Sequence, residues 1–163
     1  MKTTTGYGPG SPVAKLSTAA SERTPFLAAD GALWLAIGTS PTLIGSRIHR
    51  AAPATTTFGD PTLVDLQTPD VPSITEDSPV LTTDGLTLYF ASTRPLGEDR
   101  RIWRARRSSS NSPFAAPTLV PELAPTPNLF LGPTSISADQ CELYFHRLEL
   151  SGAGSFKIYR ARR

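Results

Sequence analysis

Three stretches of the chain share one pattern of apolar and polar positions. In each stretch a short apolar run follows a proline, a turn comes next, and a second apolar run is rich in leucine and aromatic residues. The turns contain Asp30, Asp84 and Asp139, which are 54 and 55 residues apart. Self-similarity at such a period indicates supersecondary units that pack against their neighbours. The chain is therefore predicted to be a repeat protein.

Each repeat is predicted to consist of β-strands, because its apolar runs are short, rich in aromatic and β-branched residues, and bounded by turn-forming residues. Asp-Gly pairs at 30–31 and 84–85 suit tight hairpin turns, whereas Gln140 replaces the glycine in the third repeat. The predicted strands are 25–27, 33–37, 48–51 and 58–66 in the first repeat, 79–81, 88–91, 102–105 and 114–123 in the second, and 133–136, 143–145 and 158–161 in the third.

The third strands, at 48–51, 102–105 and 158–161, all begin with isoleucine and end with arginine and alanine. Because side chains alternate along a strand, the isoleucine and the arginine lie on one face. The fourth strands contain a proline near their start, which is typical of edge strands. Four antiparallel strands in a unit of about 50 residues are typical of a β-propeller blade. The predicted fold class is all-β, with three four-stranded propeller blades in the chain.

The predicted blades lie around residues 20–68, 74–124 and 130–163. Residues 1–11 are predicted to be a flexible amino-terminal segment. Residues 12–16 match the fourth strands of the first two repeats. They are therefore predicted to form a clasp, which is a fourth strand without a blade of its own.

Three blades do not close a ring, since propellers have 4–8 blades. An open arc exposes an unpaired strand edge and an apolar blade face, and both favour association. We expect two chains to close a six-bladed ring with twofold symmetry, each donating residues 12–16 to the last blade of its partner. Two alternatives stay open at this point, a fragment of a longer propeller and a monomeric arc.

Residues 78–94 carry a Ser-Pro start, an Asp-Gly turn, and Leu-Tyr-Phe-Ala-Ser-Thr-Arg at 88–94. In this pattern the chain resembles the repeats of TolB-type, WD-like β-propellers. The resemblance covers residues 12–163, although the first repeat has Ile-Gly-Thr at 37–39, where serine and arginine are expected. It implies a six-bladed ring in a bacterial protein of the periplasm or cell envelope, which docks a protein or peptide at the mouth of its central channel. No apolar signal-peptide region is visible near Met1, so the compartment stays open.

Composition narrows the function classes. The chain has 163 residues, 39% of them hydrophobic, and no stretch approaches the roughly 20 apolar residues of a membrane helix, so membrane insertion is not expected. The net charge is +2, and the arginine clusters at 100–107 and 157–163 come with no recognisable aromatic stacking platform, so no nucleic-acid partner is predicted. Cys141, the only cysteine, excludes an internal disulfide and is predicted to be a small buried residue.

The candidate binding residues are Glu76, Asp77, Arg94 and Arg147. The two acids precede a first strand and the two arginines follow second strands, so all four are expected near the mouth of the channel. The competing interpretation is that they form ion pairs that link neighbouring blades. The repeated aspartates are assigned to turns, no catalytic residue is assigned, and neither a metal site nor a cofactor is predicted.

The resulting prediction is a non-enzymatic β-propeller that acts as a protein-binding or scaffolding module and forms a homodimer. Fold alone does not establish function, so two alternatives are kept. One is a hydrolase or lyase that acts on a saccharide or peptide in the channel, with Asp77, Arg94 and His146 as its candidate residues. The other is a fragment of a longer propeller with no function of its own.

Overall fold

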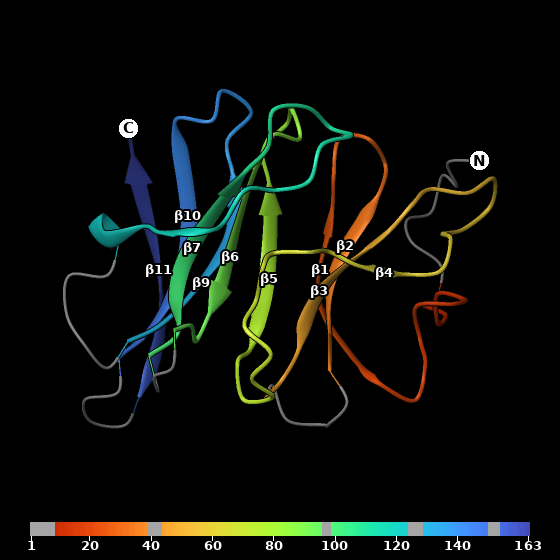
Figure 1. Ribbon diagram of the computed structural model, residues 1–163, viewed down its shortest axis with the longest axis horizontal. Helices are drawn as coiled ribbons and strands as arrows, with labels where there is room; N and C mark the ends of the chain where they lie inside the picture. The colour runs from red at the N-terminus through yellow and green to blue at the C-terminus, as the bar shows by residue number, and fades with distance from the viewer. Residues whose placement is uncertain (1–8, 39–43, 96–98, 124–128, 150–153) are drawn as a thin grey trace.

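The computed structural model spans residues 1–163, and the structure describes residues 9–38, 44–95, 99–123, 129–149 and 154–163 (Figure 1). In this part of the chain there are eleven β-strands, one short 3-10 helix and no α-helix. The prediction of an all-β fold is confirmed.

The strands form three antiparallel sheets, and the strands of each sheet follow one another in sequence order. The first sheet consists of β1 (Ser21–Leu27), β2 (Leu33–Gly38), β3 (Arg47–Ala51) and β4 (Thr62–Leu63). The second sheet consists of β5 (Glu76–Leu81), β6 (Thr87–Ser92), β7 (Arg101–Arg106) and β8 (Thr118–Leu119), and the 3-10 helix η1 (Pro121–Leu123) follows it. The third sheet consists of β9 (Leu129–Ile136), β10 (Glu142–Glu149) and β11 (Ser155–Arg162).

The three sheets stand side by side in the order of the sequence (Figure 1). The first strand of the second sheet, β5, contacts β1, β2 and β3 on one side and β9 on the other. All six residues of β5 are buried. The first strands of the three sheets, β1, β5 and β9, are therefore neighbours in the interior.

Two apolar cores hold this row of sheets together. The core between the first and second sheets contains Trp34, Ile48, Leu88 and Phe90. The core between the second and third sheets contains Tyr89, Ile102, Leu143 and Phe145. Full burial of one such side chain contributes about 1.5–3 kcal/mol.

We call the face that a sheet turns toward the next sheet its forward face, and the opposite one its backward face. As predicted, the isoleucine and the arginine of each third strand share a face, here the forward one.

The hairpin turns between first and second strands confirm the turn assignment of the repeated aspartates. Gly31 and Gly85 have φ angles of 79° and 71°, and Gln140, which replaces the glycine, also has a positive φ of 61°. The Oδ1 atom of Asp84 accepts the N–H of Leu86 at 2.9 Å, and the other two aspartates accept the N–H two residues on in the same way. Hydrogen bonds, above all from Thr82, lower the pKa of Asp84.

The amino-terminal clasp is not formed in this structure. Residues 14–16 make a turn instead of a strand, because Lys15 has a positive φ of 67° and the N–H of Leu16 donates to the carbonyl of Val13 at 3.1 Å. Leu16 is buried within its own chain, and Lys15 pairs with Asp60 at 3.1 Å. The third sheet has no fourth strand among the described residues.

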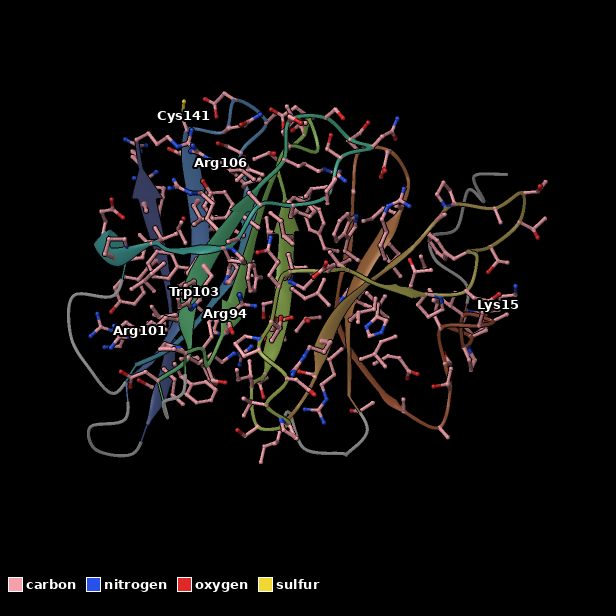
Figure 2. The ribbon with its side chains drawn as sticks, viewed as in Figure 1. Lys15, Arg94, Arg101, Trp103, Arg106 and Cys141 are labelled. Atoms are coloured by element: carbon pink, nitrogen blue, oxygen red, sulfur yellow. The ribbon has the colours of Figure 1, made fainter. Side chains whose placement is uncertain are left out.

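Two further expectations differ from the structure. The fourth strands are only two residues long, at 62–63 and 118–119, whereas 58–66 and 114–123 were predicted; prolines in both segments remove backbone donors and limit pairing. Cys141 is exposed, because it lies at the end of the β9–β10 turn, at the edge of the molecule (Figure 2). Among the described residues, no helix has the length and apolar character that would let it cross a membrane.

Candidate functional site

A β-bulge interrupts the first strand of every sheet at a corresponding place. The register with the second strand shifts between Arg23 and Phe26 in β1 and between Asp77 and Val80 in β5. In the third sheet the shift falls opposite Tyr144 and Phe145. Bulges of this kind re-aim side chains and are common next to functional sites.

The three bulges line a common cavity of about 260 Å³, which we call the bulge cavity. Its walls come from all three first strands, and the ring of His146 on β10 contributes to the third wall. The residues of the bulges that line it are Thr24, Pro25, Ser78, Pro79, Pro133 and Thr134. The described part of the chain therefore gathers the first strands around one concave space.

His146 fits there because residue 132 is glycine. The two residues face each other across β9 and β10, and a Cβ atom at Gly132 would collide with the imidazole ring. The ring also packs edge-on against Phe156, with 5.4 Å between ring centroids. Burial, followed by the positive charge of Arg100, lowers the pKa of His146. The imidazole is thus a neutral hydrogen-bonding group in the wall of the bulge cavity at neutral pH.

Glu76 and Arg94, two of the predicted binding residues, form a buried ion pair. The guanidinium of Arg94 also donates to the carbonyl of Leu66 at 3.2 Å and to Oγ1 of Thr68 at 3.0 Å, and Thr68 donates to Glu76. Figure 2 shows Arg94 beside Trp103, with 5.6 Å from the guanidinium carbon to the ring centroid. Both partners of the ion pair belong to the second sheet, and the contacts of Arg94 to Leu66 and Thr68 hold the connection that follows the first sheet. The pair is thus an internal ion pair of one sheet and does not link two sheets.

Asp77 is fully buried and pairs with Arg100, whose importance the sequence did not reveal. Burial lowers the pKa of Arg100 to about 10. Its guanidinium lies 5.3 Å from the ring centroid of Phe130, and its carbonyl accepts the N–H of Leu131 at 2.9 Å. Arg100 therefore links the second sheet to the third. It escaped notice because it stands in an arginine-rich run that reads as solvent-exposed.

Arg147 lies on a different sheet from the other three predicted binding residues. It is on β10 of the third sheet, and its guanidinium is 5.6 Å from the ring centroid of Tyr159. The structure thus places Glu76, Asp77 and Arg94 together on the second sheet and Arg147 on the third. In the first three, the charged groups are already matched inside the protein.

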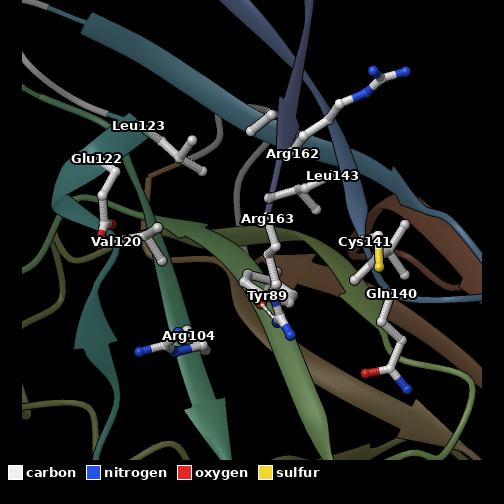
Figure 3. Close-up of a pocket in the computed structure, with 12 residues that line it drawn as sticks. Tyr89, Arg104, Val120, Glu122, Leu123, Gln140, Cys141, Leu143, Arg162 and Arg163 are labelled. Atoms are coloured by element: carbon white, nitrogen blue, oxygen red, sulfur yellow. Dashed lines mark hydrogen bonds between the residues drawn. The ribbon is translucent and has the colours of Figure 1, made fainter.

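A second cavity, of about 240 Å³, lies between the second and third sheets at the end where the hairpin turns are (Figure 3). We call it the arginine cleft. Its apolar lining consists of Tyr89, Val120, Leu123, Ile136, Leu143 and Ala161. Its charged lining consists of Arg104, Arg162, Arg163 and Glu122, so positive charge prevails.

Two of the arginines in the cleft already have partners. Arg163 donates to the hydroxyl of Tyr89 at 2.8 Å, the contact drawn in Figure 3, and Arg162 donates to Glu142 at 2.7 Å. Arg104 differs, because its Nε atom is buried without a hydrogen-bond partner among the described residues. An apolar cavity beside a buried guanidinium N–H that lacks an acceptor can bind a group that has an apolar body and a hydrogen-bond acceptor. The sequence had indicated only solvated arginines here.

Neither cavity brings together a set of metal ligands. Among the described residues there is no group of three or more histidine, cysteine, aspartate or glutamate side chains that could hold an ion. His49 lies on β3 of the first sheet, with Nδ1 3.0 Å from the carbonyl of Arg47, and His146 lies on the third sheet. Comparison of the sequence with protein-family models and with curated proteins finds no match to either.

Proposed function

We propose that the protein is a non-enzymatic, TolB-like β-propeller module that binds other proteins. In this proposal the three sheets are blades, and two chains close a six-bladed ring. The order of the sheets supports it, because β1, β5 and β9 are neighbours and their bulges line one cavity. That cavity becomes part of the wall of the central channel, where a protein or peptide partner docks.

One observation carries the proposal of ring closure. Ile48, Ile102 and Ile158 stand at the same position of the third strand in successive sheets. The first two are covered by the next sheet and are 0% exposed, whereas Ile158 is 70% exposed. Phe156, on the same face, is 63% exposed. The forward face of the third sheet therefore carries large apolar side chains that the described residues leave exposed.

The other end of the row offers a matching surface. Leu27 pairs with Leu33, and Leu63 pairs with His49, so both lie on the backward face of the first sheet. Both are largely exposed. A twofold axis would place the forward face of each third sheet against the backward face of the partner's first sheet, which buries both surfaces in two identical contacts.

The enzyme alternative is less well supported by the geometry. Asp77 and Arg94 are held in buried ion pairs, and a substrate would have to displace a guanidinium to reach either carboxylate of the second sheet. Of the three candidates, His146 lines the bulge cavity, whereas Asp77 and Arg94 line neither the bulge cavity nor the arginine cleft. Screening of peptides and glycans tests the point: saturable binding without product supports the module, whereas turnover that is lost in His146→Ala or Asp77→Ala would refute it.

Light scattering after size-exclusion chromatography tests ring closure. The expected mass is twice the 17.4 kDa of the chain. Ile158→Asp places a charge in the proposed contact and should yield the single-chain mass, whereas Ser110→Asp, in an exposed loop, should not. A wild-type protein that elutes and scatters as a single chain at all concentrations would refute the ring.

A further inference from the structure

Phe114 shows how the gap between the first and second sheets is completed. It lies on the segment that leads into β8, and its ring is buried between the sheets. The ring packs edge-on against Trp34 with 6.1 Å between centroids. The guanidinium of Arg107 lies 4.7 Å from the ring centroid on another side. One phenyl ring thus fills this gap at the end of the sheets that carries the turns between first and second strands.

The arginine cleft lies at the corresponding place between the second and third sheets. Strand register pairs Trp34 with Arg50 and Tyr89 with Arg104, so Tyr89 occupies the position of Trp34. Both of these aromatic residues lie on forward faces. None of the described residues that line the cleft places an aromatic ring where Phe114 lies in the first gap. The corresponding space between the second and third sheets is therefore an open cavity.

The backbone around Arg163 confirms this correspondence. The N–H of Arg107 donates to the carbonyl of Leu86 at 3.0 Å, and the N–H of Arg163 donates to that of Cys141 at 3.0 Å. Arg163 therefore occupies the position in the third sheet that Arg107 occupies in the second. Arg107 lies over the ring of Phe114, and Arg163 lines the cleft. A guanidinium so placed favours an aromatic ring beneath it, because the face of a ring is electron-rich.

The open edge of β11 can hold a chain that brings such a ring. In the first two sheets, the fourth segment makes the same two backbone hydrogen bonds to the third strand, namely Gly59 to Ala52 and Val64 to Ile48 in one, and Ala115 to Arg106 and Val120 to Ile102 in the other. The corresponding carbonyls of the third sheet belong to Arg162 and Ile158. No strand among the described residues pairs with this edge of β11, which makes it a template for an added strand.

The charges of the cleft indicate a further feature of the occupant. Between the first and second sheets, Arg50 is neutralised by Asp30 at 3.1 Å. Its counterpart Arg104 has no such partner among the described residues, since Asp84 instead accepts hydrogen bonds from its own turn and from Gln140. A carboxylate from the occupant would satisfy the buried Nε atom of Arg104.

We propose that the arginine cleft and the edge of β11 bind an extended peptide segment of a partner protein. The segment adds a fourth strand to the third sheet and inserts an aromatic side chain into the cleft beneath Arg163. An acidic residue shortly after the aromatic one pairs with Arg104. Residues 58–64 of this chain, Phe-Gly-Asp-Pro-Thr-Leu-Val, have the required order. This inference names a partner class for the proposed binding module, but the cleft lies within one chain and does not require ring closure.

The test uses the full chain and a fluorescently labelled synthetic peptide with the sequence of residues 56–65 as the probe. We expect saturable binding by fluorescence anisotropy. Replacement of the phenylalanine in the peptide by alanine should weaken binding about tenfold or more, as loss of a buried ring predicts. Replacement of its first aspartate by asparagine should weaken binding to the wild-type protein but have little effect on the Arg104→Met variant, because the two groups form one interaction.

Variants of the protein provide matched controls. Ala161→Phe fills the cleft and should abolish binding, whereas Arg106→Met, at an exposed residue outside the cleft lining, should leave it unchanged. Ile158→Asp, which separates the chains of the proposed ring, should still bind the peptide, so failure of the ring and failure of the cleft are distinguishable.

Three results would overturn the proposal. They are equal affinities for the phenylalanine and alanine peptides, full binding by Ala161→Phe, and the absence of saturable binding by the wild-type chain. In the last of these cases, binding that arises only after deletion of residues 1–16 would identify the amino-terminal segment of this chain or of a second copy as the occupant instead of an external partner.

Discussion

The backbone N–H of Ser78 donates a hydrogen bond of 3.0 Å to Oγ1 of Thr24, the residue at the same place in the preceding repeat. Thr24 and Ser78 have φ angles of 48° and 51°, so both lie in the left-handed region. Non-glycine residues adopt this conformation only where the surroundings hold them in it. The bond thus joins two strained bulges across adjacent sheets and fixes the spacing of β1 and β5.

We predict that Thr24→Val lowers the free energy of unfolding by about 1–3 kcal/mol, because it leaves the N–H of buried Ser78 without an acceptor. Valine is also β-branched, so the backbone strain at position 24 is unchanged by this substitution. Thr24→Ser keeps the hydroxyl group and is the matched control, which should be more stable than Thr24→Val. Urea unfolding measures both, and equal stabilities would show that the hydrogen bond has no role.

The buried ion pair of Glu76 and Arg94 gives a second prediction. Glu76→Gln should lower the free energy of unfolding by about 3–5 kcal/mol, because it leaves the guanidinium buried without its counter-charge. Arg94→Met removes the other partner and should also destabilise the protein. The double variant should lose less stability than the two single variants together, since the first substitution already removes the interaction. Strictly additive losses in urea unfolding would contradict a direct pair.

Parts of the fold follow from local sequence patterns, because they depend on neighbours along the chain. The Asp-Gly turns follow from glycine's tolerance of positive φ, and the common face of isoleucine and arginine follows from the strand period of two. That period says which face a side chain takes but not how deeply it is buried. Glu76 could therefore be assigned to a rim, although it is fully buried against Arg94.

Other features depend on contacts between segments that are distant in the sequence. Residues 12–16 resemble a fourth strand, yet strand formation needs an edge to pair with, and within its own chain Lys15 instead pairs with Asp60. The absence of a plugging ring from the described lining of the arginine cleft is recognised only when the position of Phe114 is compared with the corresponding gap between the next two sheets. The burial of Arg100 within its arginine-rich run could not be predicted for a related reason, because its partner Asp77 lies on β5, distant along the sequence.

Gly132 and His146 give a third prediction, which concerns the fit of the bulge cavity wall. Gly132→Ala places a methyl group against the imidazole ring and should lower the free energy of unfolding by about 1–3 kcal/mol, as overpacking does. Combination with His146→Ala removes the obstacle, so Gly132→Ala should cost much less stability in that background. Thermal or urea unfolding of the four proteins measures this, and the same cost in both backgrounds would rule out the contact.

The pH dependence of stability provides the last prediction. Burial and the charge of Arg100 lower the pKa of His146 below its ordinary value of 6.5. Below pH 6.5 the unfolded chain therefore binds a proton at this residue more readily than the folded protein does, and protonation favours unfolding. The stability contributed by neutral His146 is present above pH 6.5 and is lost as the pH falls toward the folded pKa. Urea unfolding of the wild type between about pH 8 and about pH 5 should show this loss.

His146→Gln is the test variant, because glutamine does not titrate in this range. Its free energy of unfolding should fall less steeply below pH 6.5 than that of the wild type. His49→Gln removes the only other histidine, which lies on the first sheet, and retains the titration of His146. It is the matched control for the loss of one histidine, and His146→Gln should flatten the slope more than this variant does. If His146→Gln and the wild type lose stability in parallel, the imidazole in the bulge cavity does not control the acid response, and the carboxylates that titrate at lower pH are responsible.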